Sequence, residues 1–86
     1  MAYSVVYKKS VYRDLERLPK AEARRILDRI EKELPKKADT QPSLKGRFVG
    51  LRRYRVGDYR VIYALVEDNI LVLRIGHRRD VYRKET

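Results

Sequence analysis

The sequence contains no cysteine, which excludes disulfide bonds, thiolate zinc sites and thiol nucleophiles. It has no Gly-rich phosphate-binding loop pattern and no apolar run long enough to cross a membrane. The N-terminal stretch MAYSVVYKK lacks the apolar segment of a secretory signal. We therefore expect a cytoplasmic protein that does not act on a membrane.

The chain is also short, with 86 residues, and we expect a single domain over residues 1–86. A domain of this size buries only roughly 60–65% of the surface that its unfolded chain exposes, so its core is thin. There is no room for a deep enclosed cleft or for a separate cofactor domain. A surface groove is therefore the kind of site that we expect.

Positive charge is abundant and unevenly distributed. The chain has 22 Lys and Arg against 12 Asp and Glu, a formal net charge of +10. Segment 44–60 holds six basic residues and one acid, and segment 74–84 holds five and one. The solvated surface of a thermostable protein is also rich in charge, but it mixes both signs, as residues 8–37 do. Concentrated positive charge instead indicates a polyanionic partner.

One strand and two helices are predicted in the first part of the chain. AYSVVY (2–7) is β-branched and aromatic, which is typical of a strand. Apolar residues at helical spacing then predict a helix that Ser10 caps and Pro19 ends, and a second helix that Pro35 ends. The two apolar stripes are Val11, Leu15 and Leu18, then Ala23, Ile26, Leu27, Ile30 and Leu34.

Three strands are predicted after a polar, turn-rich loop at 36–50. Turn residues at Gly57-Asp58 and at Glu67-Asp68-Asn69 separate the strands. The order β-α-α-β-β-β predicts a small α+β domain, with a mostly antiparallel sheet and a helical hairpin packed on one face. The expected strands cover roughly 51–56, 59–66 and 70–76.

Alternation along these strands predicts which side chains the helices cover. Arg60 points away from the covered face, and a hairpin at Gly57-Asp58 brings Arg53 and Arg55 to the same open face. Arg74 points away as well. The residues expected under the helices are Tyr59, Val61, Tyr63 and Leu65 in one strand and Leu71, Leu73 and Ile75 in the next.

Two segments, LKGRFVGLRRYRVGDYRVIY (44–63) and IGHRRDVY (75–82), resemble the RelE branch of the RelE/ParE toxin superfamily. The resemblance covers almost the whole chain and agrees with the predicted element order. It implies a toxin of a type II toxin–antitoxin pair that enters the ribosomal A site and cuts mRNA there. The implied partners are an acidic RelB-like antitoxin, the ribosome and mRNA.

The implied reaction uses no metal and no cofactor. The 2′-hydroxyl attacks the adjacent phosphate and leaves a 2′,3′-cyclic phosphate and a 5′-hydroxyl end. Such a reaction needs a base, cations that stabilise the phosphorane and an acid for the leaving oxygen. No pair of carboxylates lies in the basic segments, and arginine is a strong bidentate clamp for phosphate.

The resemblance assigns the catalytic roles residue by residue. Arg60, in the GDYR motif, stabilises the scissile phosphate, and Arg78 serves the leaving group or the phosphorane charge. Tyr82 stacks on or orients the nucleotide, or assists proton transfer. Some family members have two lysines where this chain has Leu51 and Arg53, so the identity of the base is open.

His77 is the candidate for the base or acid, because histidine is the residue type whose unperturbed pKa lies near neutrality. Arg74 is expected to pair with a carboxylate of the antitoxin. The remaining basic residues are expected to contact the ribosomal RNA backbone rather than to do chemistry. They are Lys45, Arg47, Arg52, Arg55, Arg79 and Arg83.

Two other functions fit the same predicted fold. One is a ParE-like gyrase inhibitor, which acts by protein binding without cleaving RNA. The other is an RNA-binding module without catalysis. The GHRRDVY tail (76–82) favours the endonuclease, because the gyrase-directed branch generally lacks this combination of arginine and tyrosine.

Overall fold

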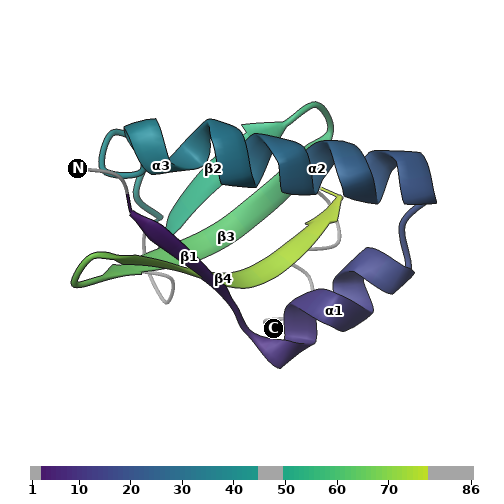
Figure 1. Ribbon diagram of the computed structural model, residues 1–86, viewed down its shortest axis with the longest axis horizontal. Coiled ribbons are helices and arrows are strands. Elements are labelled where there is room, and N and C mark those ends of the chain that lie inside the picture. Colours follow the sequence, from purple (N-terminus) through teal and green to yellow (C-terminus); the bar gives the residue numbers. More distant parts are fainter. Residues whose placement is uncertain (1–2, 45–49, 78–86) are drawn as a thin grey trace.

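In the computed structural model, which describes residues 3–44 and 50–77, four strands form one sheet. Its order is β1-β4-β3-β2, with β1 parallel to β4 and the other neighbours antiparallel (Figure 1). The predicted α+β class and mostly antiparallel sheet are therefore confirmed. The strands are β1 (Ser4–Tyr7), β2 (Arg52–Val56), β3 (Tyr59–Val66) and β4 (Asn69–His77).

The helices lie between β1 and β2 in the chain. They are α1 (Lys9–Glu16), α2 (Lys20–Lys32) and the short α3 (Leu34–Lys37). Helix α2 crosses one face of the sheet, whereas α1 lies beside β4 (Figure 1). No helix in the described part of the chain is both long and apolar enough to cross a membrane.

Two predicted helix boundaries are wrong. Helix α1 begins at Lys9 with Lys8 as its N-cap, and the Ser10 hydroxyl instead donates to the carbonyl oxygen of Leu73 at 2.8 Å. Helix α2 ends at Lys32, and Pro35 lies in the first turn of α3. Proline is tolerated there because the first N–H groups of a helix have no intrahelical partner.

The core lies between α2 and the sheet face that α2 covers. Ile26 and Ile30 of α2 are fully buried in one cluster with Val61 and Tyr63 of β3. Val11 of α1 reaches the same cluster, although Leu15 and Leu18 are only partly buried. Tyr59 and Leu65 pack against the cluster as well, so the face predicted for β3 is confirmed.

The face predicted for β4 is wrong over its first half. Ile70 and Val72, rather than Leu71 and Leu73, are buried in the core. The pairing of β4 with β3 shifts by one residue, because Tyr63 pairs with Val72 while Ile62 pairs with Arg74. The extra residue reverses the alternation, so Ile75 returns to the core.

The hairpin between β2 and β3 turns at Gly57-Asp58, as predicted. Val56 pairs with Tyr59 across this two-residue turn, and Gly57 has a φ of 60°. Glycine at the first turn position with positive φ is typical of a type II′ turn, whose twist matches that of the strands. The turn therefore sets the register that pairs Arg55 with Arg60.

We predict that Gly57→Ala lowers the free energy of unfolding by about 1 kcal/mol, because alanine at positive φ is strained. A Cβ at Gly57 would also lie 2.9 Å from Arg25 Nη2, but that flexible side chain can move aside. Urea unfolding measures the change. Asp58→Ala at the neighbouring turn position should change the free energy by less than half as much, and equal losses would contradict the role of φ.

Candidate functional site

Arginines from three strands gather on the sheet face away from α2. Arg55 pairs with Arg60, and Arg53 pairs with Ile62, which in turn pairs with Arg74. Cross-strand partners project from the same face of a sheet. We call the set Arg53, Arg55, Arg60 and Arg74 the arginine face.

Arg55 and Arg60 stand directly opposite each other, an arrangement of like charges that destabilises a sheet. Arg53 and Arg55 are exposed, whereas Arg60 is only 8% exposed. Arg60 Nη1 lies 3.5 Å from the carbonyl oxygen of Gly57 and 3.4 Å from that of Tyr59, which are weak contacts. An anion on this face would offset the repulsion, since guanidinium groups bind phosphate in a bidentate manner.

Arg74 pairs with a carboxylate of its own chain. Its Nε lies 2.9 Å from Asp14 Oδ2 and its Nη2 lies 3.0 Å from Asp14 Oδ1. The acidic partner that the sequence suggested in an antitoxin is thus supplied by α1. Asp14 was missed as a site residue, although it lies on the apolar stripe of α1, three residues after Val11.

Arg52 lies on the other face, opposite Tyr63. Its Nη1 donates to the carbonyl oxygens of Asp39 at 3.2 Å and Gln41 at 2.7 Å. These bonds hold the loop after α3 against β2. The RNA contact expected for Arg52 stays a prediction, beside this structural role.

His77 pairs with Tyr59 at the end of β4, and the two rings meet edge to face with centroids 6.0 Å apart. Tyr59 packs against the core. Because His77 is opposite Tyr59, and Tyr59 and Arg60 are adjacent in β3, the His77 and Arg60 side chains lie on opposite faces of the sheet. This geometry counts against the base or acid role suggested for His77, because a base and a phosphate clamp must reach one phosphodiester.

Several predicted site residues lie outside the described residues, and their roles stay predictions. They are Lys45, Arg47, Arg78, Arg79, Tyr82 and Arg83.

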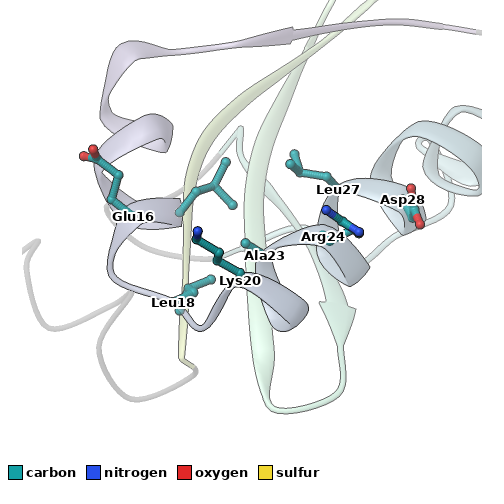
Figure 2. A pocket seen from close by; sticks show the side chains of 8 residues that line it. Glu16, Leu18, Lys20, Ala23, Arg24, Leu27 and Asp28 are labelled. Atoms are coloured by element: carbon teal, nitrogen blue, oxygen red, sulfur yellow. The ribbon is translucent and has the colours of Figure 1, made fainter.

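The groove between α1 and α2 is a separate feature (Figure 2). Its apolar lining comes from Leu15, Leu18, Ala23 and Leu27, and its charged lining from Glu16, Lys20, Arg24 and Asp28. The two acids and two bases balance, and no strand arginine lines it. The groove therefore lacks the concentrated positive charge of the arginine face.

Buried Tyr63 and partly buried Tyr7 have structural roles. Burial raises the pKa of Tyr63 to about 12, and its hydroxyl donates to the carbonyl oxygen of Ala38 at 2.6 Å. Burial also raises the pKa of Tyr7, and the hydrogen bond to Glu31 adds to the effect. Within 3–44 and 50–77, no three His, Asp or Glu side chains are grouped so that they could hold a metal ion.

Comparison with known proteins identifies the family to which the chain belongs. Residues 5–82 match the family model of the ParE toxin of the type II toxin–antitoxin system parDE. The chain therefore belongs to this family of the RelE/ParE superfamily, and it is a toxin of a type II toxin–antitoxin system. No match was found among curated protein sequences.

Solved structures share the fold. A chain of the archaeal RelE–RelB complex from Pyrococcus horikoshii is 37% identical, with a TM-score of 0.65 and coverage of 93% of this chain and 99% of that one. A chain of the RelBE2 toxin–antitoxin complex from Mycobacterium tuberculosis is 23% identical, with a TM-score of 0.84. The match covers 91% of this chain and 100% of that one. A chain of the chromosomal ParDE system from P. aeruginosa is 14% identical, with a TM-score of 0.72 and coverage of 88% and 96%. Chains from RelE–RelB, RelBE2 and ParDE systems therefore all share the fold of this chain.

We predict that Arg55→Gln weakens binding to a single-stranded oligonucleotide and lowers the slope of log K against log salt by about one. The same change should raise the free energy of unfolding by about 0.2–1 kcal/mol, because it removes the charge opposite Arg60. Fluorescence anisotropy at several salt concentrations and urea unfolding measure the two effects. Arg24→Gln, on α2, removes the same charge elsewhere and should leave the salt slope unchanged. Equal changes in the salt slope for both variants would show that oligonucleotide binding depends only on the net charge of the protein.

Proposed function

We propose that this toxin is a ribosome-dependent endonuclease that cuts mRNA in the A site by attack of the 2′-hydroxyl on the adjacent phosphate. The observation that supports this most is the pairing of Arg55 with Arg60, with Arg53 on the same face. Guanidinium groups of neighbouring strands on one face can bind a phosphodiester in a bidentate manner, which suits an RNA ligand.

Arg60 is the residue that we assign to the scissile phosphate. Its low exposure restricts its motion, and its position beside exposed Arg53 and Arg55 gives a phosphodiester backbone a cationic surface around it. A preorganised cation stabilises the charge of the phosphorane without reorganisation at the moment of reaction.

Arg78 is assigned to the leaving 5′-oxygen or to the phosphorane charge. It follows Gly76 by two residues, and Gly76 is the residue of β4 that pairs with Arg60. Two residues of extended chain span at most about 7 Å. The connectivity therefore supports a role for Arg78 at the same phosphodiester as Arg60, with Tyr82 stacking on the nucleotide.

We assign no side chain of the described residues as the general base, because His77 lies on the face opposite to Arg60. Arg53 stands where some superfamily members have a lysine, and it is exposed. Its guanidinium stays protonated at neutral pH and cannot accept the proton of the 2′-hydroxyl, so Arg53 serves the charge of the phosphorane and the proton passes to solvent water. The reaction is therefore expected to depend mainly on electrostatic stabilisation of the phosphorane by Arg60, Arg78 and Arg53.

The partner that holds the toxin inactive is proposed to be an acidic RelB-like antitoxin. The net charge of +10 and the exposed arginines suit an acidic segment. The similar chains from P. horikoshii and M. tuberculosis come from complexes of this kind.

Inhibition of gyrase by protein binding is the second candidate function, because the matching family model is that of ParE. The two functions give opposite results in two assays. A gyrase inhibitor blocks DNA supercoiling by purified gyrase and leaves mRNA intact, whereas an endonuclease cuts mRNA and leaves supercoiling unaffected.

We predict that Arg60→Ala reduces mRNA cleavage by about 10²–10³-fold, because it removes a cation placed at the developing charge. Primer extension on an mRNA in a translating extract locates and quantifies the cuts. Arg60→Lys keeps the charge without the bidentate fork, so its rate should lie between those of the wild type and Arg60→Ala.

Arg24→Ala is the matched control and should cleave like the wild type. Circular dichroism must show that the Arg60 variants remain folded, because this side chain is buried. Cleavage by folded Arg60→Ala at the wild-type rate would contradict the role of Arg60. Intact mRNA with the wild-type protein would contradict the endonuclease itself.

A further inference from the structure

Asp14 is a buried carboxylate with donors on both oxygens. It is 7% exposed, and its Oδ2 accepts from the backbone N–H of Ile75 at 2.9 Å as well as from Arg74 Nε at 2.9 Å. Its Oδ1 accepts from Arg74 Nη2 at 3.0 Å. A side chain of α1 thus binds β4 through one backbone group and one guanidinium.

These bonds continue the edge of the sheet where β1 ends. The last pair of β1 with β4 is Tyr7 with Val72, and Lys8 then donates its backbone N–H to the Val72 carbonyl at 2.9 Å. Beyond this point Ser10 donates to the Leu73 carbonyl and Asp14 accepts from Ile75. Two side chains of α1 therefore replace the missing strand at the edge of β4, where backbone groups would otherwise lack partners.

The same short stretch of β4 carries the register shift. Up to Val72 the pairs follow one register, and from Arg74 onward they follow another, which leaves Leu73 as the extra residue. The Ser10 hydroxyl donates to the carbonyl oxygen of Leu73, the extra residue. The Asp14 carboxylate accepts from the next two residues, Arg74 and Ile75. The contacts of α1 thus fall on the bulge and on the first residues of the shifted register.

The shift decides what lies opposite Arg60. In the structure its partner is Gly76, and Arg74 lies on the arginine face opposite Ile62. If the register of Tyr63 and Val72 continued unshifted, Ile75 would stand opposite Arg60 and Arg74 opposite the core residue Val61. The unshifted register would thus place a guanidinium against the apolar core and an isoleucine beside Arg60.

We propose that Asp14 is a positioning residue that locks the bulge of β4 and so keeps Gly76 opposite Arg60. Its catalytic consequence rests on the proposed endonuclease, because Arg78 follows this stretch of β4. Asp14 touches no substrate, and it acts by fixing the register in which Gly76 pairs with Arg60.

Asp14→Asn tests the proposal in the full chain, because it keeps the side-chain size but turns an amide N–H₂ toward the donors of Arg74. Glu16→Gln is the matched control, since it removes the same charge from an exposed position of the same helix. The double variant Asp14→Asn/Arg74→Gln offers two neutral side chains that can hydrogen-bond to each other. It should restore the register in part.

Two readouts separate positioning from general stability. Nuclear Overhauser contacts between the backbones of Arg60 and Gly76 report the register, and single-turnover cleavage on saturating ribosomes reports the rate. Asp14→Asn should weaken these contacts and lower the rate at least tenfold, with less than a twofold change in ribosome affinity. Glu16→Gln should match the wild type in both, and the double variant should recover part of the rate.

An Asp14→Asn protein that keeps the Arg60–Gly76 contacts overturns the proposal, whatever its rate. A lost contact with an unchanged rate overturns it as well, because the register would then not govern catalysis. Absence of cleavage by the wild type refutes the endonuclease instead. In that case the nuclear Overhauser contacts between Arg60 and Gly76 still test whether Asp14 fixes the register of β4.

Discussion

The shift of one residue in the pairing of β3 with β4 determines which side chains of the sheet share a face. Before the shift, Ile70 and Val72 lie in the core, and after it Ile75 does. The same shift turns Arg74 to the arginine face and places glycine opposite Arg60. Helix α1 supports this arrangement, because Ser10 and Asp14 bind β4 at the residues where the register changes.

The arginine face combines fixed and exposed cations. Arg60 is buried and Arg74 is paired with Asp14, whereas Arg53 and Arg55 are exposed. Fixed cations supply preorganised charge at one point, and exposed cations attract a polyanion over a longer range. The proposed phosphate site uses both kinds of cation, with Arg60 fixed beside exposed Arg53 and Arg55.

The sequence predicted the order of the four strands and the two longer helices, the helix-covered face of β3 and the Gly57-Asp58 hairpin, because each depends on local periodicity or turn chemistry, but it did not predict the short helix α3. The faces of β4 were not predictable in the same way. Residues 70–73 are all apolar, so alternation alone does not distinguish Leu71 and Leu73 from Ile70 and Val72 as the buried set. The partner of Arg74 lies 60 residues away in α1, so no local pattern reveals it. The only signal was an acid on the apolar stripe of α1.

We expect the phosphate of an RNA to lie against Arg60, on the face away from α2. The most direct measurement is a structure of the toxin on a ribosome with an mRNA that carries a 2′-deoxy nucleotide at the cleavage position. We predict a guanidinium nitrogen of Arg60 within about 3 Å of an oxygen of that phosphate. A bound toxin whose arginine face points away from the mRNA would contradict this prediction.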